Sequence, residues 1–321
     1  MSRIPSGRKG IFTKELPGPS TPFREAVMEA ESHGIGGLYL GSPRSISPEL
    51  NPAELAEAGQ FAGSRGVTLG ISAGMLNPYQ PGRSEEALAA GSGDWALGLL
   101  RLIEAARCLG QREVMLVVGT EYDRFNRSVE WGEQLKAVAG FLRRITPDVR
   151  SLGSRILIKT HQEITSWEVI RLLDSLDPEL FAAAFDPVNL IVRMENPLAA
   201  AERLAGRIGQ VHLDDARLQW RGSGLARALC PIGSGCIRWP ELIMKVRTSD
   251  PDAWYWGELH QAELVMPFLS PGWFTDHPDI MLEEVSSWLG GAQPLTAAPE
   301  SLVGSRAGRV DALLAFLDYH C

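Results

Sequence analysis

Four short apolar runs in the second half of the chain end in side chains that can carry chemistry. In chain order these are Lys159, His161 and Glu163; Asp186 and Asn189; His212, Asp214 and Asp215; and Glu258 with His260. Carboxylates and imidazoles together bind divalent cations such as Mn²⁺, Mg²⁺, Co²⁺ or Zn²⁺. Amines and carboxylates also take up and return protons. Each residue alone is weak evidence, but the set predicts a site that combines metal binding with proton transfer.

The elements that position these side chains alternate between apolar strands and amphipathic helices. Strands are predicted at 10–15, 36–41, 67–72, 113–119, 155–161, 181–187, 208–214 and 253–260. Helices are predicted between them, at 22–34, 51–66, 93–110, 129–145, 165–176, 197–206 and 239–248. Eight strand–helix alternations indicate an α/β fold, a (β/α)8 TIM barrel, whose catalytic groups lie at the carboxyl ends of the strands. The alternative is a doubly wound sheet, but no Gly-rich nucleotide motif follows the first strand.

The domain organisation predicted is a single barrel over residues 1–321, with a C-terminal helical extension at about 270–321. The loop at 216–236 is expected to be irregular, either a lid over the site or a plain surface loop. A connector is expected at 289–308, before a last helix. Thr165 or Ser166 is expected to cap the helix at 165–176, with Glu168 completing the cap.

Composition restricts the classes of function. Of 321 residues, 45% are hydrophobic, enough for a large core, and the net charge is −8. That acidity argues against a nucleic-acid surface and gives no attraction to an acidic membrane. No signal-length or membrane-spanning apolar run is present in the sequence, and the four cysteines lack zinc-site spacing. These features predict a reduced, cytoplasmic protein.

Two stretches carry a resemblance to a known family. "FDPVNLIVRMENPLAAAERLAGRIGQVHLDDA" contains Asp-Pro-x-Asn at 186–189 and His-x-x-Asp at 212–215, and "PIGSGCIRWPELI" contains Gly-x-Gly-x-Ile-x-Trp at 233–239. These motifs resemble those of the xylose-isomerase-like sugar isomerase/epimerase superfamily. The resemblance is strongest over 155–260 and thin before 110.

The resemblance implies one divalent metal, held in that family by Glu, Asp, His and Glu on strands five to eight. Asp186, His212 and Glu258 match three of these positions. The strand-five motif, usually Glu-x-His, reads Lys-Thr-His at 159–161. The resemblance is therefore to a branch of the family in which a lysine replaces one ligand.

The lysine changes the electrostatics of the expected site. Two unit charges 4 Å apart interact by roughly 4 kcal/mol at an effective dielectric near 20, and a divalent metal doubles that repulsion. Lys159 is therefore expected to be a neutral base, to pair with Glu163 or Asp186, or to replace the metal as electrophile; a plain ion pair without catalytic function is the fourth alternative. We expect the metal to be kept. Its expected ligands are His161, Asp186, His212 and Glu258.

Further roles follow from position and from the resemblance. Proton transfer is expected from Lys159 and Glu258. Contacts with substrate are expected from Asn189, Arg217, Trp256 and His260. Two carboxylates are expected to hold other groups in place: Asp215 behind His212, and Glu163 beside Lys159.

The function expected is a metal-dependent isomerase or epimerase of a keto-sugar, polyol or related hydroxy-carbonyl compound. Alternatives are a lyase or dehydratase on the same scaffold, since fold does not decide the reaction, and a metal-free binding or partner subunit that lost its site through Lys159. A DNA-repair endonuclease is disfavoured, because Asn189 stands where that branch needs a histidine and the net charge is acidic. The expected partner is a small sugar-like molecule, and a homo-oligomer stays open.

Overall fold

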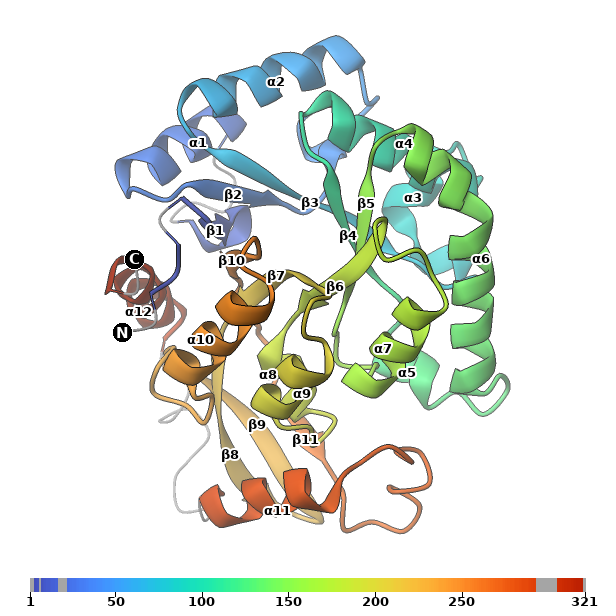
Figure 1. The fold of residues 1–321 in the computed structure, drawn as a ribbon, viewed down its shortest axis with the longest axis vertical. Helices are drawn as coiled ribbons and strands as arrows, with labels where there is room; N and C mark the ends of the chain where they lie inside the picture. Colours follow the sequence, from blue (N-terminus) through green and yellow to red (C-terminus); the bar gives the residue numbers. More distant parts are fainter. Residues whose placement is uncertain (1–2, 6, 17–21, 293–304, 320–321) are drawn as a thin grey trace. The chain divides into compact units, whose positions relative to one another are not determined.

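The computed structural model describes residues 3–5, 7–16, 22–292 and 305–319, and Figure 1 labels their elements. Eight parallel strands close a barrel in the order β1-β10-β7-β6-β5-β4-β3-β2. Their bounds are β1 Lys9–Phe12, β2 Gly37–Leu40, β3 Thr68–Met75, β4 Glu113–Val117, β5 Arg155–Lys159, β6 Phe181–Phe185, β7 Ile208–Leu213 and β10 Trp254–Gly257. The predicted (β/α)8 barrel is confirmed, and each predicted strand overlaps one of these.

Two compact units divide the chain, one of them formed by Ser6–Lys159 and Arg171–Ala184. It contains β1 to β5 and most of β6, paired in parallel with a register that sets Lys159 opposite Ala184. Its helices are α1 Phe23–Ser32, α2 Pro52–Ser64, α3 Glu85–Ala90, α4 Trp95–Cys108, α5 Glu121–Arg124 and α6 Trp131–Ser151. Most strand residues are buried, as expected for parallel strands covered by helices.

The other unit comprises Met1–Pro5, Thr160–Ile170 and Phe185–Cys321. Within it β7 pairs with β10, and the helices are α8 Pro187–Ile191, α9 Pro197–Arg203, α10 Trp239–Ser249, α11 Leu282–Gly291 and α12 Arg306–Tyr319. The helix α7, Ser166–Asp174, begins in this unit. The predicted connector at 289–308 is helical at both ends, and 293–304 lie outside the described residues. The single-domain expectation stays a prediction.

The stretch 216–236 is not an irregular loop, so that prediction was wrong. Strands β8, Asp215–Arg221, and β9, Gly224–Cys230, form an antiparallel hairpin, and β11, Leu264–Met266, adds a third strand beside β9. The turn residues between them include Gly222 with a φ of 50°. The two-residue turn is a hairpin signal. However, β9 is buried along its whole length and lacks the alternation of polar and apolar residues by which a strand is usually predicted.

The predicted cap of α7 is confirmed. The backbone N–H of Thr165 donates to Glu168 Oε2 at 2.8 Å, and the N–H of Glu168 donates to Thr165 Oγ1 at 3.1 Å. This reciprocal pair satisfies two of the helix's unbonded donors.

A buried ion cluster lies beside the start of α7. Glu195 accepts hydrogen bonds from the N–H and Oγ of Ser166, both at 2.8 Å, and lies 3.2 Å from Arg203. Arg203 also pairs with Glu284 of α11 at 2.6 Å. Burial raises the pKa of Glu195 to about 7, against the opposing effect of Arg203.

This shift predicts a pH-dependent contribution to stability. Because the carboxyl pKa is raised, the folded state keeps the Glu195 proton up to a higher pH than the unfolded state does. The stabilisation of the folded state by this protonation is therefore complete below about pH 4 and is lost as the pH rises through 7. The free energy of unfolding of wild type minus that of Glu195→Gln should fall by about 3 kcal/mol from pH 4 to pH 8, in urea titrations. Glu202→Gln, an exposed position of α9, serves as control. A constant difference for Glu195→Gln would contradict the expectation.

Among the described residues, no helix combines the length and apolar character needed to cross a bilayer.

Candidate metal centre

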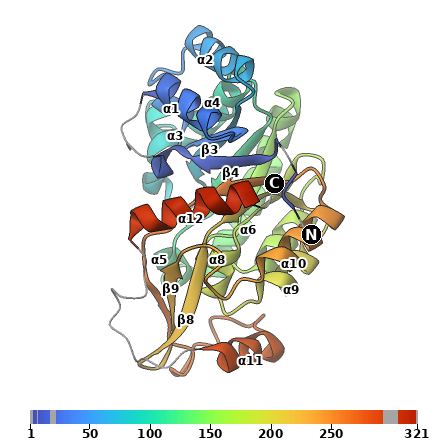
Figure 2. The same ribbon diagram turned by 90° about the vertical axis from the view of Figure 1, so that its left-hand side faces the viewer.

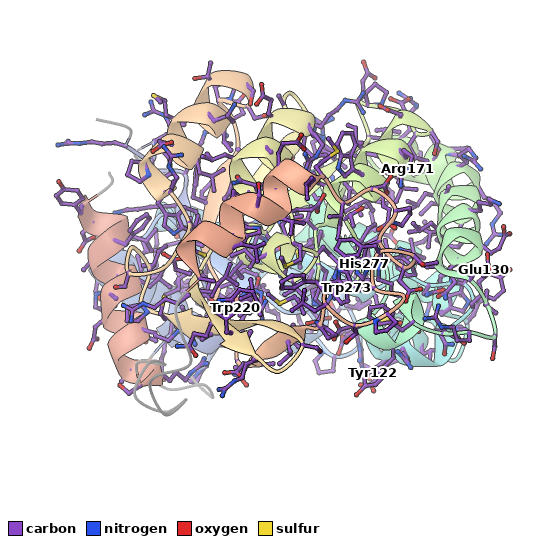
Figure 3. The ribbon with its side chains drawn as sticks, turned by 90° about the horizontal axis from the view of Figure 1, so that it is seen from below. Tyr122, Glu130, Arg171, Trp220, Trp273 and His277 are labelled. Atoms are coloured by element: carbon purple, nitrogen blue, oxygen red, sulfur yellow. The ribbon has the colours of Figure 1, made fainter. Side chains whose placement is uncertain are left out.

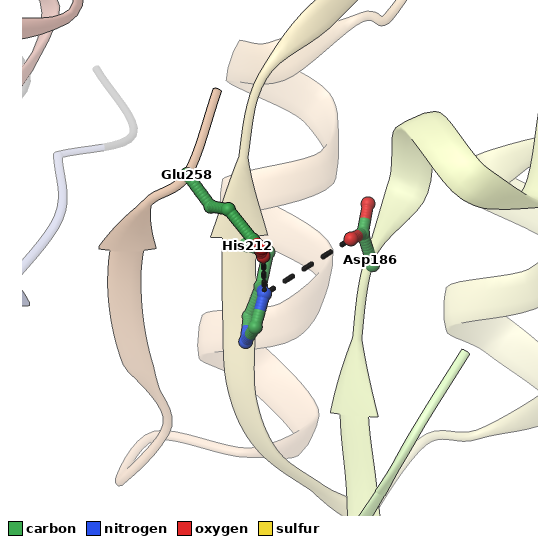
Figure 4. Close-up of side chains that lie close together, drawn as sticks. All are labelled: Asp186, His212 and Glu258. Atoms are coloured by element: carbon green, nitrogen blue, oxygen red, sulfur yellow. Dashed lines mark hydrogen bonds and ion pairs between the residues drawn. The ribbon is translucent and has the colours of Figure 1, made fainter. Parts of the chain in front are cut away.

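Asp186, His212 and Glu258 come together in one buried cluster, with one ligand atom from each lying within 4.8 Å of the others (Figure 4). His212 Nδ1 lies 2.5 Å from Glu258 Oε2 and 4.0 Å from Asp186 Oδ2. All three residues belong to the unit that contains β7 and β10. The structure therefore brings together three of the four residues expected to hold a metal.

The ends of three barrel strands place these side chains. Asp186 directly follows β6 and caps α8, accepting from the N–H of Asn189 at 3.4 Å. His212 lies in β7 opposite Trp256 of β10. Glu258 directly follows β10, and its N–H donates to Leu213 O at 3.1 Å, which continues the pairing by one residue. The cluster lies at the carboxyl ends of these strands, where barrel enzymes carry their chemistry.

The donor set suits a divalent cation. Two carboxylates and one imidazole supply oxygen and nitrogen ligands of the kinds that Mn²⁺, Co²⁺ and Zn²⁺ accept. Three protein ligands with further positions open to water or substrate are the pattern of catalytic rather than structural zinc. Burial matters as well, since two carboxylates taken out of water are stabilised by a nearby positive charge.

Two side chains hold one oxygen of Asp186. Asn189 Nδ2 donates to Asp186 Oδ2 at 2.8 Å, and His260 Nε2 lies 3.1 Å from the same oxygen. The other ring nitrogen of His260, Nδ1, lies 3.0 Å from Asp214 Oδ2. Burial lowers the pKa of His260, but Asp186, Asp214 and Glu258 outweigh it and raise the pKa to about 8. At neutral pH both ring nitrogens of His260 therefore donate.

Two buried arginines, which the sequence interpretation did not include, donate hydrogen bonds to Asn189 and Asp214. Arg227 of β9 donates to Asn189 Oδ1 at 3.0 Å. Arg309 of α12 donates to both oxygens of Asp214, at 2.8 and 2.9 Å. No local pattern marks either arginine as buried, because what covers them comes from distant parts of the chain.

The strand-five residues are arranged differently from expectation. His161 Nδ1 faces Glu163 in a close pair, and His161 is not part of the three-residue cluster. Its assignment as fourth ligand stays a prediction. Lys159 is the last residue of β5, only 3% exposed, and belongs to the other unit. The next residue, Thr160, is tied to Asp186: its Oγ1 accepts from the Asp186 N–H at 2.7 Å.

Asp215 does not orient His212, and that expectation was also wrong. Its carboxylate accepts from the N–H groups of Ala216, Gly233, Gly235 and Ile237, between 2.8 and 3.3 Å. Burial raises the pKa of Asp215 to about 6, although these N–H groups favour the charged form. Asp215 therefore anchors the Gly-x-Gly loop before α10, and the residue that orients a histidine is its neighbour Asp214.

Two residues expected to touch substrate have other contacts. Arg217 Nε donates to Ser234 O at 2.9 Å, in the same loop that Asp215 anchors. Trp256 is only 2% exposed and stacks on Trp254, with ring centroids 4.9 Å apart. Trp256 is thus packed as a core residue, and its contact with substrate stays a prediction.

The Gly-x-Gly loop predicts a strong steric effect at Gly235. A Cβ built there would lie 2.0 Å from Asp215 Oδ1 and 2.5 Å from Ala216 O. We expect Gly235→Ala to lower the free energy of unfolding by about 1–3 kcal/mol, as overpacking does, measured by urea titration. Gly140→Ala in α6, where the added Cβ meets nothing within 4 Å, should instead stabilise by about 0.5–1 kcal/mol. Equal stability of the two variants would contradict this reading of the loop.

A second buried histidine lies away from the cluster. His277 Nδ1 donates to Trp273 O at 2.8 Å, so its Nε2 accepts from Arg193 Nη1 at 2.8 Å. The rings of Trp273 and His277 stack with centroids 4.0 Å apart, and Figure 3 labels both. These contacts hold the segment that follows β11.

Comparison with known proteins agrees with the barrel fold. The model of the xylose isomerase-like TIM-barrel family matches residues 27–278. The uncharacterized protein YihM of Escherichia coli is 25% identical over 122 residues, which cover 38% of this chain and 37% of that protein. Inosose dehydratase 2 of Bacillus cereus is 27% identical over 158 residues, covering 44% of this chain and 53% of the relative. The matches thus span about half or less of these curated relatives.

Solved structures share the fold at low sequence identity. D-psicose 3-epimerase, solved in the presence of D-fructose, superposes with a TM-score of 0.63 and 14% identity, covering 97% of this chain and 96% of that one. The IolI protein, solved with a bound zinc atom, gives a TM-score of 0.59 and 13% identity, covering 87% and 98%. At such identity the likeness concerns the fold alone.

Proposed function

Since the chain belongs to the xylose isomerase-like TIM-barrel family, we propose that it is a metal-dependent enzyme. Its substrate would be a keto-sugar, a keto-polyol or a related hydroxy-carbonyl compound, from which it removes a proton beside the carbonyl. The observation that carries the proposal is the buried cluster of Asp186, His212 and Glu258 at the carboxyl ends of three barrel strands. Isomerisation or epimerisation is the first outcome considered.

The proposed division of labour uses groups already described. A divalent cation held by Asp186, His212 and Glu258 would polarise the carbonyl and hydroxyl oxygens of the substrate. The Glu258 carboxylate takes the proton from the carbon beside the carbonyl. Lys159 returns a proton, in place of the second glutamate of the family motif. Asn189 and His260 keep Asp186 in its orientation, since both contact its Oδ2.

A dehydratase is the second candidate. Several curated relatives are named inosose dehydratase, which favours loss of water after the same proton removal. In that case Lys159 donates its proton to the departing hydroxyl instead of to carbon. The two candidates therefore share their first step and differ in where the second proton goes.

Elemental analysis of purified wild type beside Lys159→Glu tests the metal requirement first. We expect about one equivalent of Mn, Co, Zn or Fe in wild type. Metal present only in Lys159→Glu would refute the proposal and favour the metal-free binding subunit. The same samples are then incubated in D₂O with D-fructose, D-tagatose and an inosose. Deuterium beside the carbonyl, followed by NMR, would report the shared step, and an enone absorption would report water loss.

A small sugar-like substrate is part of this proposal. Association into a homo-oligomer and a cytoplasmic location stay predictions.

A further inference from the structure

A chain of hydrogen bonds connects α12 to the proposed metal site. Arg309 Nη2 donates to both oxygens of Asp214, and Arg309 Nη1 donates to the backbone oxygen of His260 at 2.9 Å. Asp214 in turn accepts from the backbone N–H of His260 at 2.8 Å and faces its Nδ1 at 3.0 Å. The opposite ring nitrogen of His260 lies 3.1 Å from Asp186 Oδ2. One guanidinium thus holds His260 by its main chain directly and by its ring through Asp214.

The helix that carries Arg309 is packed against the strand that leads into Glu258. A Cβ at Gly257 would lie 2.6 Å from Leu313 Cδ2, so the absence of a side chain at Gly257 lets α12 approach β10 closely. Further along the helix, Phe316 meets Trp239 of α10 edge-on, with centroids 5.8 Å apart. Figure 2 shows α12 as one continuous helix. Arg309 therefore extends from a fixed support, and its guanidinium is buried with the ion pair.

We infer that Arg309 is a positioning residue of the proposed metal site, acting through Asp214 and His260 on the orientation of the ligand Asp186. This inference rests on the proposed function, because it assigns Asp186 to a metal. Because Nη2 donates to Asp214 while Nη1 of the same planar guanidinium donates to the His260 carbonyl, Arg309 fixes direction as well as charge. Removing a group that is hydrogen-bonded directly to a metal ligand typically lowers metal affinity 10- to 100-fold. Arg309 lies behind such a group, so its expected effect is at the lower end of that range.

In this arrangement α12 holds Arg309 in place beside Asp214. Without Arg309, Asp214 is held only by the N–H groups of Asp215 and His260 and by the His260 ring, so its carboxylate fixes that ring less firmly. His260 then orients Asp186 Oδ2 less firmly, while Asn189 still donates to that oxygen. Metal binding must in that case also order the Asp186 carboxylate, and the entropy lost in doing so lowers the metal affinity.

The test measures Co²⁺ affinity and the visible spectrum of the Co²⁺ complex, together with the urea midpoint of each sample. Arg309→Met is expected to weaken Co²⁺ binding about 10-fold and to change the spectrum, while Arg309→Lys recovers part of the affinity. Removing one partner of a buried ion pair destabilises a fold, whereas removing both is tolerated. The double variant Asp214→Asn/Arg309→Met therefore keeps the measurement informative if Arg309→Met does not fold.

Coupling and controls separate the outcomes. In the Asp214→Asn background, Arg309→Met should cause little further loss of affinity, because the two residues act in one chain. Asp311→Asn, on the exposed side of α12, should leave affinity and spectrum unchanged. Wild-type affinity in folded Arg309→Met or in the double variant overturns this inference and leaves the proposed function intact. Wild type that binds no Co²⁺, Mn²⁺ or Zn²⁺ overturns both.

Discussion

Asp186→Asn and His212→Ala are each expected to abolish stoichiometric metal binding and turnover. Asp186→Asn keeps the shape of the side chain and the cap of α8 but replaces a charged oxygen by an amide. Because a direct ligand matters more than the groups behind it, we expect affinity to fall by more than about 100-fold. Elemental analysis of the purified variants measures this directly.

The loss of metal binding should also remove the stabilisation that the metal gives to the folded protein. A metal that binds only the folded state at about 100 times its Kd stabilises the protein by roughly 2.7 kcal/mol. Wild type should therefore show a higher melting temperature in Mn²⁺ or Co²⁺, and both variants should show none of this shift. Glu241→Gln, at an exposed ion pair with Arg238 in α10, should behave as wild type. A variant that keeps the shift and the turnover would remove Asp186 or His212 from the site.

Lys159→Met is expected to keep the metal and to lose turnover by about 10²- to 10⁴-fold, the range typical of a positioned acid or base. Lys159 is buried at the end of β5, one residue before Thr160, whose hydroxyl is bonded to the Asp186 backbone. A neutral side chain there removes proton transfer and leaves the proposed metal ligands in place. Steady-state kinetics on the substrate found by deuterium exchange measure the loss.

Lys159→Arg distinguishes charge from proton transfer. Arginine keeps a positive charge but does not release its proton in a protein, so turnover should stay as low as in Lys159→Met. Recovery of turnover in Lys159→Arg would mean that the charge alone matters. Lys136→Met, an exposed position of α6 in the same unit, is the matched control. Normal turnover in Lys159→Met would exclude Lys159 from catalysis.

The barrel was predictable because its signal is local. Each buried parallel strand is a short apolar run and each covering helix has its own period, so the order of elements follows from neighbouring residues. The antiparallel hairpin β8–β9 was missed for the opposite reason: β9 is covered on both faces and lacks alternation. The turn at Gly222 was the one local feature of the sequence that indicated a hairpin.

For the site, the sequence by itself predicted that polar side chains at the ends of four strands meet, because carboxyl ends of barrel strands face one side. The resemblance to the family selected Asp186, His212 and Glu258 among them, and the structure brings these three together. The sequence did not determine which neighbours complete the site. Tertiary packing turned His161 to Glu163, bound Asp215 to a loop, and brought Arg309 to Asp214 across 95 positions. Side-chain direction and burial depend on atoms far away in the chain, and no local pattern encodes them.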